Sequence, residues 1–161
     1  MWKRKAVKIL HSIAGIGYGG GLAAYLLVLM FAPEITDVSQ HLALRESLAS
    51  VSKWMILPSM VVVVTSGLLA MVVHYPFMNA PWVWLKALSG LLIFEATLAS
   101  IDGPAQAAKR AAQDAVDGNM DLATLNELLG AEWTALYILL SLAVVNVVLA
   151  IWRPTFGMKT Q

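Results

Sequence analysis

The stretch WMILPSMVVVVTSGLLAMVV, residues 54–73, decides the fold of this chain. It carries no charged side chain, and about 20 such residues in a helix are enough to cross a bilayer core about 30 Å thick. Comparable apolar stretches occupy residues 9–31, 82–101 and 133–152. Lipid offers no partners for unpaired peptide groups, so each stretch is expected to be helical. The sequence therefore predicts an all-α four-helix transmembrane bundle.

The composition agrees with a single integral membrane domain over residues 1–161. Hydrophobic residues make up 59% of the chain and charged residues 13%, which is typical of multispanning membrane proteins. The absence of cysteine excludes disulfides, thiolate metal sites and cysteine nucleophiles. The sequence has no Ser/His/Asp set, no phosphate-binding glycine loop and no nucleic-acid patch. Nucleic acid is therefore not expected as a partner. The expected partner is the lipid bilayer.

The basic residues predict the orientation of the four spans. Of the lysines and arginines, seven fall on the side of the two termini and four on the opposite side. Cytoplasmic segments carry an excess of these residues, so both termini are predicted to be cytoplasmic. Residues 9–31 are expected to be a retained helix, because they are too long for the apolar core of a signal peptide.

The two loops on the opposite side are predicted to hold short helices that form an external cap. The first loop is expected to become helical near Ser39. In the second loop an alanine-rich stretch, residues 105–116, ends at the turn signal Asp117-Gly118-Asn119, and Asp121 is expected to cap a further short helix. The connection at residues 75–81 is short and holds two prolines, which predicts an antiparallel hairpin of the second and third spans.

Three basic side chains are predicted to lie at one depth, near the cytoplasmic ends of their spans. These are His11, His74 and Lys86. Ionisable residues in membrane spans are costly and often functional. At this depth, however, Lys86 could simply extend its charged end to the phosphate headgroups. His74 could likewise be an interfacial residue without a functional role.

His11 has the most specific setting of the three. Gly15 and Gly19 follow it at helical spacing on one stripe, and Gly17 and Gly21 form a second small-xxx-small pair. One interpretation is close packing of helices. The other is a flat macrocycle lying on the glycine surface, with the His11 imidazole as the axial ligand of a haem iron and Lys86 paired with a carboxylate of the ring.

Glu95 lies nine residues beyond Lys86, which places it about 13 Å deeper, near the middle of the membrane. A carboxyl group at that depth suggests a proton relay or a hydrogen bond between helices. Three side chains on other spans are possible partners: Tyr18, Tyr25 and Asn146.

Four methionines are predicted on the side opposite the termini: Met30, Met55, Met60 and Met120. Thioethers are soft ligands suited to Cu(I), which suggests copper passage, although methionine is also common filler in apolar helices.

Short motifs in all four spans resemble those of one group of membrane proteins. They are Lys8-Ile9-Leu10-His11, Ser66-Gly67-Leu68, Pro81-Trp82-Val83-Trp84-Leu85-Lys86 and Trp152-Arg153-Pro154. With these motifs the chain resembles the small bacterial membrane proteins related to the copper-resistance protein D domain and to membrane protoporphyrinogen oxidase. The resemblance implies a bacterial inner-membrane location, and in the oxidase branch it implies haem or porphyrin binding at the positions of His11 and Lys86.

The chain departs from the oxidase branch after its first span. Phe31-Ala32-Pro33-Glu34 stands where that branch has an aromatic and arginine-rich segment, so oxidase activity does not carry over. The chain has only three histidines, with His41 expected in a loop, so at most one b-type haem is expected, ligated by His11 with or without His74. The alternatives are a non-catalytic accessory or assembly subunit of a larger membrane complex or homo-oligomer, and copper passage.

Overall fold

The computed structural model describes residues 2–32, 37–73, 81–119 and 130–152. Within these ranges the chain is almost entirely helical and has no strand. The first and last helices are α1, Trp2–Met30, and α7, Gly130–Trp152. Between them lie two continuous helices of 36 residues each, Val38–Val73 and Pro81–Val116. All four are long and apolar enough to cross a membrane, so the prediction of an all-α four-helix membrane bundle is confirmed.

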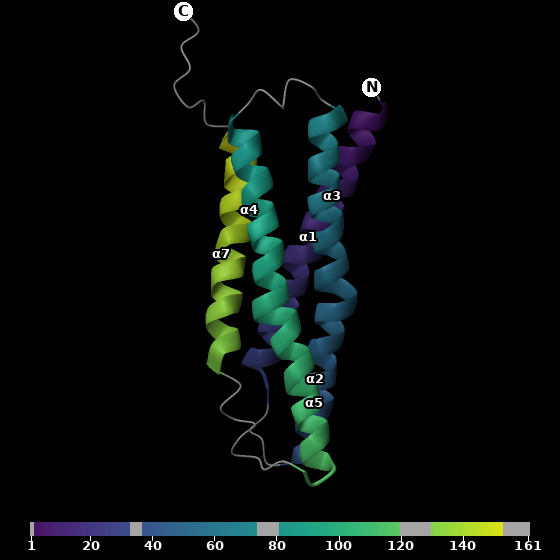
Figure 1. The fold of residues 1–161 in the computed structure, drawn as a ribbon, viewed down its shortest axis with the longest axis vertical. Helices are drawn as coiled ribbons and strands as arrows, with labels where there is room; N and C mark the ends of the chain where they lie inside the picture. The colour runs from purple at the N-terminus through teal and green to yellow at the C-terminus, as the bar shows by residue number, and fades with distance from the viewer. Residues whose placement is uncertain (1, 33–36, 74–80, 120–129, 153–161) are drawn as a thin grey trace, which may run out of the picture.

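Each 36-residue helix contains a π-helical turn. The first helix consists of α2 (Val38–Val51), η1 (Ser52–Ile56) and α3 (Leu57–Val73), and the second consists of α4 (Pro81–Thr97), η3 (Leu98–Asp102) and α5 (Gly103–Val116). A helix of this length is about 54 Å long, which exceeds the bilayer core. α2 and α5 therefore extend beyond the bundle together, as neighbours at the end of the molecule opposite the N-terminus (Figure 1).

The helical segments predicted near Ser39 and over residues 105–116 are thus present as α2 and α5, which pack against each other. Both segments continue a membrane span without a break. A continuous helix pairs its backbone groups internally, whereas two separate helices would each leave unpaired groups at their ends. The turn at residues 117–119 is confirmed, with Gly118 at a φ of 79°, while Asp121 lies outside the described residues.

The two π-helical turns have a common cause in the sequence. Each ends two residues before a proline: η1 ends at Ile56, before Pro58, and η3 ends at Asp102, before Pro104. The backbone N–H groups of Leu57 and Gly103 donate to Ser52 and Leu98, five residues back. A proline cannot donate to the ladder and its ring collides with the carbonyl four residues earlier, so a wider turn lets the helix continue past it.

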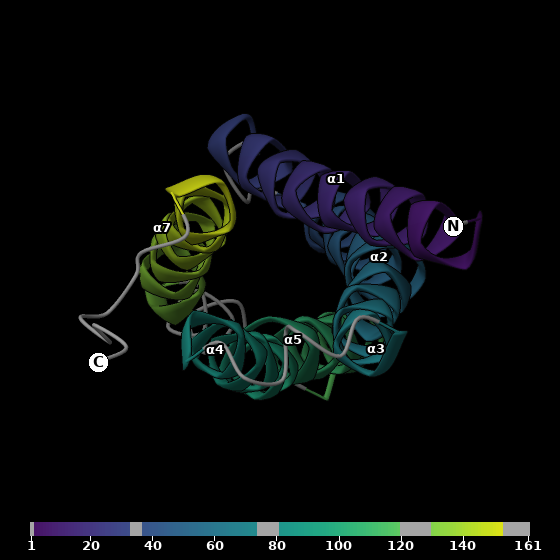
Figure 2. The same cartoon turned by 90° about the horizontal axis from the view of Figure 1, so that it is seen from above.

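The spans form a ring when viewed along the bundle (Figure 2). In that ring α3 lies between α1 and α4, and α7 closes the circuit against α4 and α1. α1 crosses obliquely: its N-terminal end lies on the α3 side and its C-terminal end approaches α7 (Figure 2). The antiparallel pairing of α3 and α4, predicted from their short connection, is confirmed (Figure 1).

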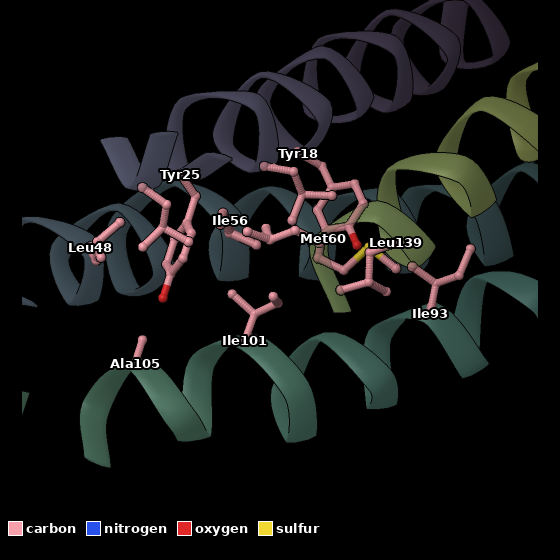
Figure 3. Close-up of a cluster of buried hydrophobic side chains, with 12 residues drawn as sticks. Tyr18, Tyr25, Leu48, Ile56, Met60, Ile93, Ile101, Ala105 and Leu139 are labelled. Carbon is pink, nitrogen blue, oxygen red and sulfur yellow. The ribbon is translucent and has the colours of Figure 1, made fainter. Parts of the chain in front are cut away.

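The core is built from one stripe of α1 and facing residues of the other helices. The stripe carries Tyr18, Leu22, Tyr25 and Leu29, each buried. Figure 3 shows the side chains that meet it, which include Ile56, Met60, Ile93, Ile101 and Leu139. Many other large apolar side chains face outward, for example on α4 and α7. An apolar surface of that extent fits lipid contact rather than water.

Candidate functional site

His11 lies between α1 and α3, and its ring is held by one nitrogen. Nδ1 is 3.0 Å from the carbonyl oxygen of Val63 and 3.0 Å from the hydroxyl oxygen of Ser66. A carbonyl oxygen only accepts, so this geometry assigns the proton to Nδ1. Nε2 then keeps its lone pair. Metal-bound histidines are oriented in the same way, with the second ring nitrogen donating to a carbonyl.

The His11 ring lies against α3 at Gly67. A Cβ atom at this position would lie 3.5 Å from Cε1 of His11 and 3.8 Å from its Nδ1. These are ordinary van der Waals distances, so an alanine would also fit beside the imidazole. Ser66, the residue before Gly67, is buried, so the hydroxyl that holds Nδ1 is fixed within the helix packing.

Lys86 is brought toward His11 from another helix. It is half-buried on α4, and its charge lies close enough to His11 to act on it electrostatically. No hydrogen bond or ion pair of the Lys86 ammonium group is found within the described parts of the chain. His11 and Lys86 thus lie within electrostatic range of each other, while His74 lies outside the described residues.

The two glycine pairs of α1 have different surroundings. A Cβ atom at Gly17 would lie 2.6 Å from Oγ of Ser59, and one at Gly21 would lie 2.8 Å from Cγ1 of Ile56. These two glycines allow the close crossing of α1 with α3 and η1. At Gly15 and Gly19, in contrast, a Cβ atom would meet nothing within 4 Å.

A third open glycine lies on α4, one helical turn after Lys86. At Gly90 too, a Cβ atom would meet nothing within 4 Å. Residues four apart lie on one face of a helix, so Lys86 and Gly90 share a face of α4 in the same way that His11, Gly15 and Gly19 share a face of α1. Each face combines one polar group with open space at the glycine positions.

Glu95 lies apart from this arrangement. Its side chain is exposed on α4, and none of the three suggested partners bonds to it. The Tyr18 hydroxyl is 2.8 Å from that of Thr97, and Oδ1 of Asn146 accepts from the Ser89 hydroxyl at 3.1 Å. Among the described residues the hydroxyl of Tyr25 makes no hydrogen bond of ordinary geometry, although it lies close to the Glu132 carboxylate. Within the described residues, no other side chain is bonded to Glu95.

The methionines considered for copper have mixed positions. Met60 is buried in the core, whereas Met30 and Met55 are exposed, and Met120 lies outside the described residues. No group of three histidine or carboxylate side chains that could hold a metal ion is found in residues 2–32, 37–73, 81–119 and 130–152. Copper passage stays a prediction.

A buried ion pair at the α2/α5 end was missed by sequence reasoning. Nη1 of Arg45 on α2 donates to both carboxylate oxygens of Glu132 on α7, each at 3.0 Å. Each side chain is only 1% exposed. The expectation that His41 lies in a loop is wrong, because His41 is buried on α2. One signal was available: His41 and Arg45 are four residues apart, on the apolar face that also carries Leu48.

A second polar contact joins the two π-helical turns. The Ser52 hydroxyl donates to Oδ1 of Asp102 at 2.9 Å, and Ser52 is fully buried. Nε2 of Gln106 approaches the same oxygen and the carbonyl of Ala49, each at 3.4 Å. The polar side chains at this end thus come from helices that are distant in the sequence.

Comparison of the chain with models of known protein families, with curated proteins and with solved structures finds no match in any of the three. The candidate site is therefore defined by its own geometry.

Proposed function

We propose that this membrane protein binds one b-type haem, or a related porphyrin, between α1 and α4 and serves a redox role. The observation that supports this most directly is the His11 imidazole. Its Nδ1–H is held by Val63 and Ser66, so Nε2 is the nitrogen available to a metal. A histidine oriented in this way is a suitable axial ligand for haem iron.

The residues around His11 fit a flat ring with acidic substituents. Gly15 and Gly19 on α1 and Gly90 on α4 adjoin open space, so a macrocycle could lie against them without displacing side chains. Lys86, within electrostatic range of His11, would pair with a carboxylate of the ring. A bound haem would supply one-electron chemistry, while the chain's own residues would orient the ring and neutralise its acidic edge.

Three further features complete the proposal. His74 is the candidate for a second axial ligand. By the distribution of lysine and arginine, both termini lie in the cytoplasm, and by resemblance the membrane is the bacterial inner membrane. Glu95, whose side chain is exposed on α4, is the candidate for a proton relay.

The test is the visible spectrum of the purified protein and of two histidine variants. Wild type is expected to show a Soret band that shifts on reduction with dithionite. His11→Gly should lose most of this band, and added imidazole should restore it by replacing the missing ligand. His41→Gln, at the other end of the bundle, should keep the band. A His11→Gly protein with an unchanged spectrum would exclude His11 as the ligand.

Lys86 is tested by the affinity for a porphyrin that has no iron. Lys86→Gln should weaken binding of protoporphyrin by about ten- to a hundredfold, because one charge-assisted contact is worth about 1.5–3 kcal/mol. A porphyrin in which both carboxyl groups are esterified should bind wild type and Lys86→Gln equally. If Lys86→Gln binds the free acid as tightly as wild type does, the lysine does not hold the carboxylate.

A second candidate is an accessory or assembly subunit, and the open stripe at Gly15 and Gly19 favours it. Small residues let another transmembrane helix approach closely, so the same stripe could receive a helix of a larger complex. In that case wild type would be colourless and would copurify with a partner. Gly15→Leu or Gly19→Leu would then release the partner, whereas under the haem proposal these variants would reduce the Soret band.

A further inference from the structure

The α2/α5 end of the bundle holds a cluster of four buried polar side chains from three helices. They are Tyr25 of α1, His41 and Arg45 of α2, and Glu132 of α7. Arg45 pairs with Glu132 through Nη1 alone. The Tyr25 hydroxyl lies close to the Glu132 carboxylate and within electrostatic range of Arg45, and His41 lies within range of Arg45. The cluster is separate from the site at His11.

Several polar atoms of this cluster have no hydrogen-bond partner in the described structure. They are Nε and Nη2 of Arg45, the hydroxyl of Tyr25, and both ring nitrogens of His41. Buried polar groups in proteins are almost always paired, because an unpaired one loses its bonds to water without replacement. The unbonded edge of Arg45, with Tyr25 and His41 within its electrostatic range, therefore indicates a missing partner.

The chemistry of these atoms defines that partner. Guanidinium nitrogens only donate, and the tyrosine hydroxyl donates well. Nε and Nη2 form one edge of the guanidinium, and this edge is free while Nη1 serves Glu132. In Figure 3 the Tyr25 hydroxyl points away from α1, toward the helix that carries Ala105 and Ile101. The missing partner must therefore supply oxygen acceptors, and more than one, because the donors come from two helices.

The local charge indicates that these acceptors are uncharged. Arg45 and Glu132 cancel each other, and the carboxylate of Asp102 also lies within electrostatic range of Tyr25. A further anion would add to a surplus of negative charge among buried groups, which is costly at low dielectric. A carbonyl oxygen satisfies the same donors without that cost.

The cluster lies where the transmembrane helices meet the extension formed by α2 and α5, and it is surrounded by apolar side chains. Leu29, Leu48, Ile101 and Ala105 are all buried in this part of the core. A ligand reaching it has to be soluble in the membrane. A ring with two carbonyl groups meets all these requirements. We propose that Tyr25, Arg45 and His41 form a binding site for the headgroup of a quinone.

The experiment uses the full chain in nanodiscs and a benzoquinone with a decyl tail as the probe. Saturable binding is measured by quenching of tryptophan fluorescence, with Trp133 directly following Glu132 in the chain. Tyr25→Phe is expected to weaken binding by about three- to tenfold and Arg45→Lys by about ten- to a hundredfold, as expected for a neutral and a charge-assisted hydrogen bond. Arg45→Lys keeps the charge opposite Glu132 but removes the free edge.

Tyr18→Phe is the matched control, because its hydroxyl already bonds to Thr97 at 2.8 Å. It should lower thermal stability and leave quinone affinity unchanged. Tyr25→Phe removes a hydroxyl without a described partner, so it should fold as wild type does even if Arg45→Lys does not. Decanoate, which carries a charged head on a comparable tail, should bind at least about tenfold more weakly than the quinone.

Three results would overturn the proposal. One is the absence of saturable quinone binding to wild type, which would leave water as the partner of the donors. Another is equal affinity of wild type and Tyr25→Phe. The third is tighter binding of decanoate than of the quinone, which would show that the cluster receives an anion.

Discussion

Arg45 and Glu132 show how strongly one buried pair ties two helices together. Removing one partner of a buried ion pair leaves the other charge buried without compensation, which costs about 3–5 kcal/mol. Glu132→Ala is therefore expected to lower the free energy of unfolding by about that amount. Equilibrium unfolding in detergent micelles by circular dichroism measures it.

The exposed pair of Lys109 and Glu46 is the control for this prediction. Its atoms lie 3.3 Å apart, but the side chains are 41% and 52% exposed. Surface pairs contribute about 0–1 kcal/mol, so Glu46→Ala should change stability little. Equal losses in Glu132→Ala and Glu46→Ala would show that burial of the first pair does not determine its contribution.

At the residue scale, the sequence aligned His11 and Lys86 by depth but did not predict the buried ion pair of Arg45 and Glu132. His11 and Lys86 could be paired by depth, because each lies about the same distance from the end of an apolar stretch. Arg45 and Glu132 lie 87 positions apart in segments read as polar loops, where charged residues are ordinary. Only the packing of α2 against the start of α7 brings them together, and no periodicity encodes that contact.

At the scale of elements, the existence and type of the spans followed from composition, but their continuity did not. Pro58 and Pro104 usually favour a helix end, and charged residues beyond them suggested separate segments. A π-helical turn before each proline keeps the helix intact. The two π-helical turns are stabilised by a contact between them, in which the Ser52 hydroxyl of η1 donates to Asp102 of η3. These residues are distant in the sequence, so the local sequence around each proline does not show that the helix continues.

The two glycine stripes of α1 predict opposite effects of the same substitution. Gly21→Ala would place a Cβ atom 2.8 Å from Cγ1 of Ile56, so it should destabilise by about 1–3 kcal/mol through overpacking. Gly19→Ala would meet nothing within 4 Å and should be neutral or stabilise by up to about 1 kcal/mol, because alanine favours a helix. Thermal unfolding of the two variants in one detergent compares them. Equal destabilisation would contradict the difference in packing.

Asp37 caps the N-terminus of α2 and makes that helix end sensitive to pH. Its Oδ1 accepts from the backbone N–H of Ser39 at 2.9 Å and from the Ser39 hydroxyl at 2.8 Å. These bonds hold the pKa of Asp37 below its usual value. The cap is therefore complete above the usual pKa of an aspartate and is lost as the pH falls through the lowered one.

Hydrogen exchange at the first turn of α2 measures this cap. At neutral pH, the Ser39 amide hydrogen should exchange faster in Asp37→Ala than in wild type. Each rate is compared with the intrinsic exchange rate of that amide in an unfolded chain of the same sequence. Below the lowered pKa the two proteins should exchange it alike. A wild-type advantage that persists in acid would mean that the carboxylate is not the source of protection.

At the scale of the whole molecule, the bundle and the distribution of basic residues lead to a labelling prediction. The chain has no cysteine, so single cysteines can be introduced without a background. Lys3 lies in the first turn of α1 and Asn119 three residues beyond the end of α5, and these two helix ends lie at opposite ends of the molecule (Figure 1). The two variants are Lys3→Cys and Asn119→Cys. In intact bacteria an impermeant maleimide should label the second and not the first. Labelling of the first alone would reverse the orientation, and labelling of both would contradict the four-span topology.

The measurement that tests the central claim most directly is the visible spectrum of mildly purified wild-type protein, oxidised and then reduced with dithionite, with its haem content determined by extraction. The account predicts about one haem per chain and a Soret band that shifts on reduction, both lost in His11→Gly and restored by imidazole. A colourless protein, or one whose band is independent of His11, would contradict it.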